Sequence, residues 1–514
     1  MTPRRRRRLL QRVAAARTRR AARRPDRSLL RAERRRQQSE DLTHRRAAVD
    51  RYRRLGNGRG QRRRFAGRVL WDQQPPAFEL STAALEAVYS FQTASAAATR
   101  GAQGIAIGPS PTGGTFSWDP WSAYQAGELT NPNVMILGDV GSGKSALAKT
   151  LVWRGLEFGR AAHVIDPKGE YAALAEAVGV EPIALRPGGG TILNPLDPGT
   201  AGRQLAPTDL FHRNVATVRA LLEATLGRTC RQLEMVLVTA ALARVSGLQL
   251  RGGPDGRPAV DGHGQIATMP MLADALIDPP AEVARRINMD PGRVIEESRD
   301  VALALDRLVD DHGDLGGMFA GHTTIDADAL GDLTVIDIAA IYRSHRAALP
   351  LVMICTAAWL QLATAITPRG RFQVNDEAWA LLSDEASARW MQTNQKLARQ
   401  LSLSVVNVMH RLSDSAAAGD AGSVTRSLAE GVITDSGTWV IYRQKPGERR
   451  LLQQTLQLND MQAQLATQLT RGRALWIVGG ETWQVALVDH CLSSIERELV
   501  DTDAAMLAAD AGPS

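Results

Sequence analysis

Short apolar runs that end in polar or glycine-rich turns recur along the chain, and they predict buried strands. The run at 135–137 leads into a glycine-rich segment and then into good helix formers. Because strand, helix and strand follow in this order, we expect parallel pairing. The further predicted strands are "AAHVIDPKGEY" (161–171), "GGGTILNPLDP" (188–198), "LTVIDIAAI" (333–341), "RFQVNDEAW" (371–379), "LSLSVVNVMH" (401–410), "GTWVIYRQ" (437–444) and "ALWIVGG" (474–480), with two short strands within "GIAIGPSPTGGTFSWDPWSAY" (104–124).

Two segments in the middle of the chain have a different periodicity. Residues 209–227 and 294–313 carry apolar side chains at helical spacing, and a Gly- and Pro-rich connector lies between them. The pattern therefore predicts an α/β fold with a central, mainly parallel sheet and a helical insertion. The predicted units are a basic N-terminal arm, helical or disordered, at 1–68, a first part of the sheet domain at 69–200, the mainly helical insertion at 201–330, a second part of the sheet domain at 331–495, and a C-terminal tail at 496–514.

One apolar stretch, "LPLVMICTAAWLQLATAIT" at 349–367, is uncharged and long enough to be compared with a membrane span. It contains Gln361, is rich in Ala and Thr, and has Pro350 near its start. A buried helix of an α/β core has the same composition. We therefore predict a buried helix and a soluble, cytoplasmic chain. The three cysteines are far apart, which fits a reducing compartment.

Charge is distributed very unevenly. Residues 1–68 contain 26 Arg and five acidic residues, a net charge of +21, so that the other 446 residues carry −13 of the overall +8. The arm suits contact with DNA or with an anionic membrane surface, and a solvated tail is the simpler alternative.

The segment "GDVGSGKS" at 138–145, called here the glycine-rich loop, has the composition of a phosphate-binding loop. Glycines let backbone N–H groups approach phosphate oxygens, and the following helix directs its positive end at them. Lys144 would reach the β- and γ-phosphates, and Ser145 would hold Mg²⁺. The predicted ATP-binding residues are Gly138, Asp139, Val140, Gly141, Ser142, Gly143, Lys144, Ser145 and Ala146.

Two adjacent carboxylates follow a later apolar strand. Asp376 is predicted to hold Mg²⁺, and Glu377 to orient or deprotonate the attacking water. His410 ends the next strand, where it would sense the γ-phosphate or serve only as a strand-end residue. Arginines near strand ends are candidates for fingers that reach a neighbouring subunit, namely Arg411, Arg426 and Arg443.

Several motifs together resemble those of the energising ATPases of type IV secretion and conjugation systems, in the FtsK–HerA superfamily of P-loop NTPases. The segments are "GELTNPNVMILGDVGSGKS", "VIDPKGEY", "ILNPLDP", "LTVIDIAAI" and "NDEAWALL", in this order within about 105–490. The resemblance implies a Mg²⁺-dependent ATPase that forms a hexameric ring. It also implies partners in a membrane secretion channel and a position at the inner face of the cell membrane.

The chain departs from that family in two respects. The family has Gln where His410 stands, and most members have a long docking domain before the motor, where this chain has about 100 largely basic residues. The leading hypothesis is a motor that powers transfer of DNA or protein across a membrane. The alternatives are a DNA-translocating coupling protein, a nucleotide-gated nucleic-acid-binding scaffold and a small-molecule kinase. Glu377 argues against the scaffold, because a protein that only binds nucleotide has no use for a base.

Overall fold

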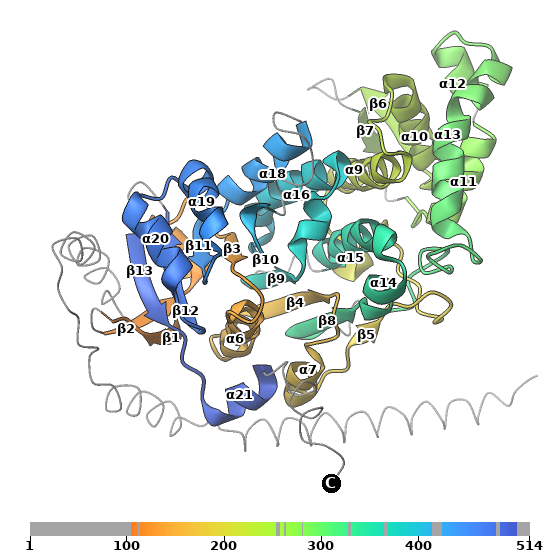
Figure 1. Cartoon of the computed structure of the whole chain (residues 1–514). Helices are drawn as coiled ribbons and strands as arrows, with labels where there is room; N and C mark the ends of the chain where they lie inside the picture. The colour runs from red at the N-terminus through yellow and green to blue at the C-terminus, as the bar shows by residue number, and fades with distance from the viewer. Residues whose placement is uncertain are drawn as a thin grey trace, which may run out of the picture.

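A nine-stranded sheet forms the centre of the protein in the computed structural model, which describes residues 104–500 except 112–113, 253–257, 262–263, 280, 327–329, 364–368, 414–423 and 480–483 (Figure 1). The strand order is β13-β12-β11-β3-β10-β9-β4-β8-β5. All neighbours from β11 to β5 pair in parallel, whereas β12 and β13 pair antiparallel at one edge. The strands are β3 (Val134–Leu137), β4 (Ala161–Asp166), β5 (Ile183–Ala184), β8 (Leu333–Asp337), β9 (Arg371–Asn375), β10 (Leu403–Met409), β11 (Thr438–Ile441), β12 (Arg473–Val478) and β13 (Gln484–Asp489). The predicted α/β fold with a mainly parallel sheet is confirmed.

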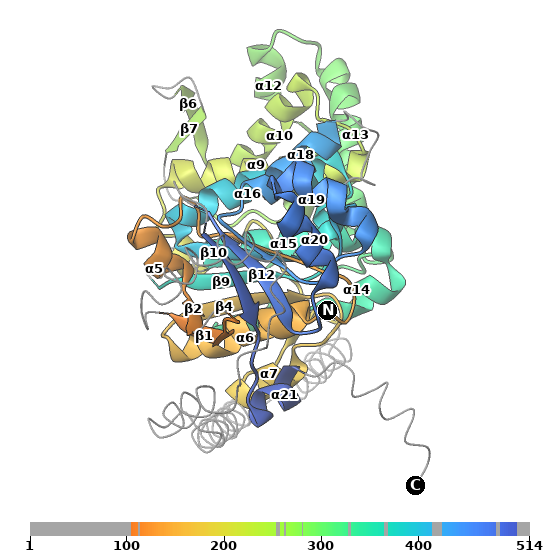
Figure 2. The same cartoon turned by 60° about the vertical axis from the view of Figure 1, so that its left-hand side comes forward.

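Helices cover both faces of the sheet, as expected for parallel strands whose crossovers are helical. Along β3, Val134 and Ile136 point into the cluster that contains Leu147 of α6, while Met135 and Leu137 belong to the cluster on the other face. Figures 1 and 2 show α6, α7 and α21 on the first face, and α15 and α16 on the second. These helices are α6 (Lys144–Glu157), α7 (Ala172–Val178), α15 (Leu349–Ala363), α16 (Glu385–Ala398) and α21 (Ser494–Val500).

The expectation of a strand at 188–198 is wrong. In this segment the backbone hydrogen-bonds to a loop of the insertion instead of to a strand, for example from Leu193 N to Met318 O at 2.8 Å. Ile192 and Asn194 likewise donate their N–H groups to the hydroxyls of Thr324 and Thr323. The edge of the sheet is formed instead by the two-residue strand β5, earlier in the sequence.

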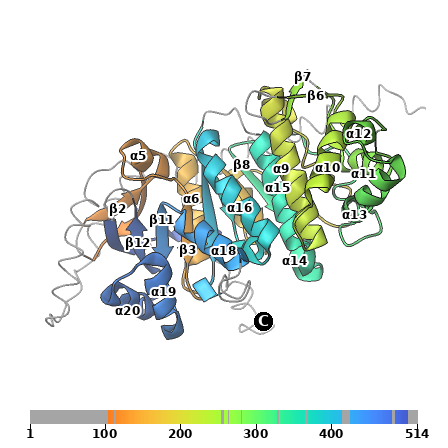
Figure 3. The ribbon, with the colours of Figure 1, turned by 90° about the horizontal axis from the view of Figure 1, so that it is seen from above.

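The helices between β5 and β8 extend away from the sheet and end in a separate group at one end of the molecule (Figure 3). α9 connects this group to the sheet domain, because it packs on α15 and α16 and also on α10 and α13. The segment comprises α8 (Gly199–Gly202), α9 (Pro207–Leu226), α10 (Gln232–Val245), α11 (Met269–Ile277), α12 (Ala281–Arg286), α13 (Pro291–Val309) and a hairpin of β6 (Gln249–Gly252) and β7 (Pro258–Asp261). The exact limits of the predicted domains stay a prediction.

The apolar stretch that was compared with a membrane span is α15, and its side chains are buried between the sheet and α9. Trp359 and Met353 are fully inaccessible to solvent. Within the described part of the chain, no helix is both long and apolar enough to cross a bilayer. The predicted buried helix is therefore confirmed for α15, in which residues 352–362 are all buried, and residues 364–367 lie outside the described residues.

The remaining elements are a hairpin before the sheet, further helices and short 3₁₀ turns. A hairpin of β1 and β2 precedes the sheet, and Arg154 of α6 ties it to the C-terminal segment through bonds to Ile107 O, Cys491 O and Glu496. The elements are β1 (Ile105–Pro109), β2 (Thr115–Trp118), α5 (Pro120–Gln125), α14 (Ala339–Ser344), α18 (Val424–Thr434), α19 (Arg449–Leu456) and α20 (Asp460–Gln468), with 3₁₀ turns η2 (Arg346–Ala348), η3 (Ala378–Leu382), η4 (Arg399–Leu401) and η5 (Pro446–Glu448). The predicted arm at 1–68 lies outside the described residues.

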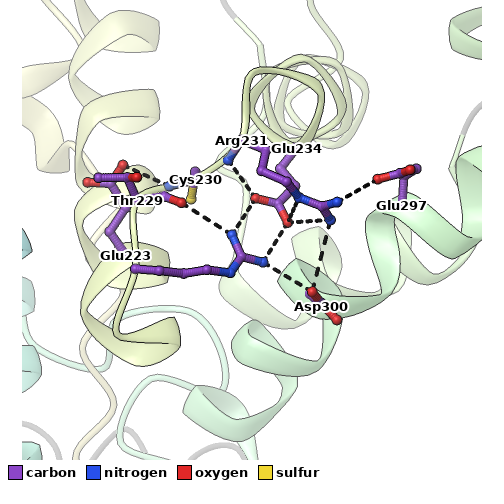
Figure 4. A network of polar contacts seen from close by, with 8 residues as sticks. Glu223, Thr229, Cys230, Arg231, Glu234, Glu297 and Asp300 are labelled. Atoms are coloured by element: carbon purple, nitrogen blue, oxygen red, sulfur yellow. Dashed lines mark hydrogen bonds and ion pairs between the residues drawn. The ribbon is translucent and has the colours of Figure 1, made fainter.

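A buried carboxylate holds the insertion together. Figure 4 shows Glu234 of α10 surrounded by donors from the loop before it, with Asp300 of α13 nearby. Arg228 donates two hydrogen bonds to Glu234, at 2.8 and 2.9 Å, and also bonds to Asp300 at 3.1 Å. Arg231 donates to Glu234 from its backbone and its guanidinium, and it pairs with Glu297 at 2.9 Å. Burial opposes ionisation of Glu234, but the two arginines outweigh it and lower its pKa to about 2.

We predict that Glu234→Gln lowers the free energy of unfolding by about 1–3 kcal/mol at neutral pH, because two arginines lose a charged acceptor. The carboxylate has a lower pKa in the folded protein, about 2, than in the unfolded chain. The stability difference from wild type should therefore be complete above about pH 4.3 and shrink as the pH falls towards 2. Urea unfolding followed by circular dichroism measures it. Glu296→Gln, at an exposed position of α13, is the control, and an equal effect of both variants would contradict the account.

Candidate functional site

The glycine-rich loop connects β3, near the middle of the sheet, to the N-terminus of α6. Its glycines are required by geometry. Gly141 has φ +72° and Gly143 has φ +117°, values that L side chains rarely adopt. At Gly138 an added Cβ would lie 2.5 Å from Cβ of Tyr442 and 2.7 Å from Oγ of Ser142. The loop therefore has its tight turn only with glycine at these positions.

Backbone hydrogen bonds fix the loop to the ends of the neighbouring strands. Gly138 N donates to the carbonyl of His410 after β10 at 3.2 Å, and Asp139 N donates to the carbonyl of Arg443 after β11 at 2.8 Å. The Ser142 hydroxyl donates to the carbonyl of Asp139 at 2.7 Å. Val140 is exposed at the tip of the loop. The loop is thus a rigid turn with an accessible tip.

Lys144 begins α6, and its side chain turns back over the loop. The ammonium donates to the carbonyl of Asp139 at 2.9 Å, and the residue is 5% exposed. Burial lowers the pKa of Lys144 to about 8, the carboxylates of Asp376 and Glu377 oppose this, and the nearby ammonium of Lys168 adds to it. Ser145 and Ala146 follow in the first turn of α6 and are half-buried. The role of these residues in binding phosphate stays a prediction.

The acid pair follows β9, two strands away from the loop. Asp376 and Glu377 are each 2% exposed. Burial, together with the charge of Glu377, raises the pKa of Asp376 to about 6. One oxygen of Asp376 accepts the N–H of Glu377 at 2.9 Å, and the other is buried and has no hydrogen-bond partner among the residues that the structure describes. A buried acceptor without a partner is costly, so it marks a place where a ligand is expected.

Glu377 is held by three side chains from three segments. One carboxylate oxygen pairs with the ammonium of Lys168 and lies 3.2 Å from Nε2 of His410. The other oxygen accepts the indole N–H of Trp379. Burial opposes ionisation here too, but the contacts with His410 and Lys168 lower the pKa of Glu377 to about 2. Glu377 also has φ 55° and ψ 37°, a left-handed conformation that is strained for this residue type.

Lys168 is the residue that the sequence reasoning missed. It lies in the turn after β4, where Asp166 accepts the N–H groups of Lys168, Gly169 and Tyr171. This turn brings the lysine to Glu377, a contact that spans more than two hundred positions of sequence. The motif "DPKGEY" was quoted for the family resemblance, and its lysine is one of only five in the chain. This rarity of lysine is the feature of the sequence that could have identified Lys168 as a candidate site residue.

The three arginine candidates are not equivalent. Arg411 faces the loop of its own chain, 3.4 Å from Asp139. Arg426 lies on α18 and pairs with Glu430 at 3.0 Å in the same helix. Arg443 is exposed and is the second residue after β11. None of these placements identifies a finger, and the assignment stays a prediction.

An open pocket of about 570 Å³ lies at the amino-terminal ends of the strands, opposite the ends that carry the glycine-rich loop. It lies before β3 and β11, where its lining includes Asn131, Asp435 and Gly437, and Lys396 and Arg399 contribute from α16 and η4. The glycine-rich loop does not line it. The predicted site and this pocket are therefore at different ends of the strands.

A glycine-rich turn between a parallel strand and a helix, facing an acid pair two strands away, is the arrangement of a P-loop NTPase fold. Residues 126–216 match the family model described as "Helicase HerA, central domain". The structure is similar to VirB4 of Thermoanaerobacter pseudethanolicus, with a TM-score of 0.59 and 20% sequence identity over 78% of this chain and 99% of that chain. These findings confirm the predicted resemblance to the FtsK–HerA superfamily.

A second similar structure is the bacterial conjugative coupling protein TrwBdeltaN70 in its unbound monoclinic form. The TM-score is 0.50 and the identity 12%, over 79% of this chain and 92% of that chain. None of the curated proteins matches the sequence significantly. Because the sequence identities are this low, the similarity to both structures shows a shared fold only.

We predict that Gly143→Ala lowers the free energy of unfolding by about 2–3 kcal/mol, because its φ of +117° is strained and the new Cβ would meet Tyr442 at 3.2 Å. Gly141→Ala should cost only about 1 kcal/mol, since a Cβ there meets open space. Gly127→Ala, at φ +73° and also open, is the matched control outside the loop. Equal losses for all three in urea unfolding would show that the loop is not tightly packed.

Proposed function

We propose that this protein is a Mg²⁺-dependent ATPase that acts as a motor of a type IV secretion or conjugation system and powers transfer of DNA or protein across a membrane. The observation that carries the proposal is the buried acid pair after β9, which lies two strands from the glycine-rich loop at the same ends of the strands and stabilises the charge of Lys144. The likeness to VirB4 and TrwB supports a motor of this class. The hydrolytic step and the substrate moved are part of the proposal.

The residues present fit a nucleotide with Mg²⁺. The unpartnered oxygen of Asp376 and the hydroxyl of Ser145 are hard oxygen donors of the kind that Mg²⁺ prefers. Among the described residues no cluster of three or more His, Cys, Asp or Glu is arranged to hold a metal ion. We propose that Asp376 and Ser145 hold the ion together with the phosphates. When bound, Mg²⁺ neutralises charge on the phosphate oxygens.

Each remaining side chain has a role that its position supports. The backbone of the glycine-rich loop and the start of α6 would bind phosphate oxygens, and Lys144 would leave the carbonyl of Asp139 to bind them too. Glu377 would accept a proton from the attacking water or orient it. His410, 3.2 Å from Glu377, would orient that carboxylate, so a direct contact with the γ-phosphate is not needed.

A coupling protein that translocates DNA is the second candidate. The likeness to TrwBdeltaN70 favours it, and so does the +21 charge of the arm. A scaffold that binds nucleotide without hydrolysis is less well supported, because it would have no use for the buried Glu377. For both motor candidates we propose a homo-hexameric ring, peripheral at the inner face of the membrane and in contact with channel proteins.

We predict that Lys144→Ala weakens nucleotide binding and abolishes turnover, because the loop loses its phosphate-binding cation. Glu377→Gln should retain nucleotide binding but slow hydrolysis at least about 100-fold, since the amide cannot accept the proton. Phosphate release measured at saturating ATP and Mg²⁺ tests both. Lys396→Ala, an exposed lysine at the opposite edge of the sheet, is the control. Normal turnover by Glu377→Gln would show that the base is another group.

We predict that ATPase activity per subunit rises steeply with protein concentration, because ring motors complete each site with a neighbour's arginine. The finger can be identified by mixing. A variant with Arg411, Arg426 or Arg443 changed to Ala keeps its own nucleotide site, and Lys144→Ala subunits would supply the missing arginine. Activity should return for one of the three arginines only. Full specific activity at concentrations where the protein is monomeric would contradict the ring.

We predict that binding to DNA comes almost wholly from residues 1–68, because they carry +21 on a body of −13. Affinity should fall steeply with salt and depend little on base sequence. Deletion of residues 1–68 should therefore remove DNA binding and leave the ATPase intact. Loss of liposome binding alone would indicate a membrane tether, and no change in either would indicate a solvated tail.

A further inference from the structure

Both oxygens of Glu377 have close polar contacts in this structure, although Oε1 makes ion-pair contacts and no regular hydrogen bond. One oxygen contacts Lys168 and His410, and the other accepts from Trp379. The residue is 2% exposed and has a strained left-handed backbone. A water molecule cannot reach a carboxylate that is both buried and enclosed by donors. Any reaction in which Glu377 activates water therefore requires that at least one of these three contacts opens first.

Lys168 is the partner best able to leave. Trp379 is only two residues away from Glu377, in the 3₁₀ turn that Glu377 precedes. His410 follows β10, its carbonyl accepts the N–H of Gly138, and its side chain is short. The side chains of Lys168 and His410 are equally exposed, at 28%, but the Lys168 side chain is longer and more flexible. Its backbone is anchored by Asp166, which accepts hydrogen bonds from Lys168 N and Gly169 N, so the side chain can move while the turn stays in place.

The position of Lys168 would allow its ammonium to contact a bound phosphate instead of Glu377. The order β3-β10-β9-β4 places the turn after β4 across two strand ends from the glycine-rich loop. The order of the strands places Lys144 and Lys168 at the same ends of the central parallel strands, and the charge of Lys168 contributes to the lowered pKa of Lys144. The β- and γ-phosphates that Lys144 is proposed to bind would lie there. A terminal phosphate carries more negative charge than a carboxylate and competes with Glu377 for the lysine.

We propose that Lys168 is a positioning residue that holds Glu377 out of reach of water and exchanges it for the terminal phosphate of a bound nucleoside triphosphate. The base is then released only when a γ-phosphate is present. This inference rests on the proposed function and adds to it a link between the third phosphate and the acid pair. A diphosphate does not reach Lys168 and leaves the contact with Glu377 closed.

Binding measurements without turnover test the exchange. The ligands are AMP-PNP, a non-hydrolysable triphosphate, and ADP, each with Mg²⁺, titrated calorimetrically. Lys168→Met should bind AMP-PNP about 10-fold more weakly, because a charge-assisted contact is lost. Glu377→Gln should bind AMP-PNP about 10-fold more tightly, because Lys168 no longer has to leave a carboxylate. ADP affinity should change little in either variant, and it also reports that each variant is folded.

The double variant separates exchange from simple charge repulsion. If Lys168 mediates the effect, Glu377→Gln gives no gain in the Lys168→Met background. Lys168→Arg, which keeps the charge, should restore part of the gain. A gain that persists without Lys168, or an unchanged AMP-PNP affinity in Lys168→Met, overturns the proposal. Failure of the proposed function is a different result, since the wild type would then bind neither nucleotide and Lys144→Ala would change nothing.

Discussion

Two adjacent carboxylates buried at the end of one strand are the constraint on which the site depends. Asp376 and Glu377 are each almost inaccessible, and like charges in a buried place cannot both stay ionised without compensation. The protein compensates the charges of the two carboxylates unequally. Lys168 and His410 form ion pairs with Glu377 and stabilise its anion, whereas one oxygen of Asp376 has neither a hydrogen bond nor an ion pair among the described residues. Glu377 is therefore held as an anion, and Asp376 keeps an oxygen that can coordinate a metal ion. The proposed chemistry requires this division of roles.

The sheet brings these groups together. Because β3, β10, β9 and β4 are parallel neighbours, the turns that follow them lie close together at the carboxyl ends of the strands. A row of buried amides supports the central strands, with Asn375 of β9 donating to Asn407 of β10 at 2.9 Å and Gln361 of α15 donating to Gln373 at 3.0 Å. Amide groups at these positions need specific partners, so they specify the register of the strands and the placement of α15.

Local patterns in the sequence were enough for the parallel strands, the glycine-rich loop and the buried helix α15. The glycine spacing at 138–145 could be interpreted alone because its geometry is local. The segment 188–198 was misassigned because its backbone bonds to residues 318–324, which no local pattern reveals. The ion pair of Lys168 with Glu377 was missed for the same reason, and the antiparallel edge strand β13 carried too weak an alternation to be predicted. Long-range partners account for the first two differences, and a weak local pattern accounts for the third.

Hydrogen exchange measured by mass spectrometry with and without Mg²⁺ and AMP-PNP tests the central claim most directly, namely that nucleotide binds where the carboxyl ends of the central strands meet. The account predicts slower exchange in peptides covering 138–150, 166–171, 375–379 and 409–411, all of which border this edge. Residues 130–133 and 434–437, at the pocket on the opposite edge, should be unaffected. Protection at those residues, with none in the glycine-rich loop, would contradict the account.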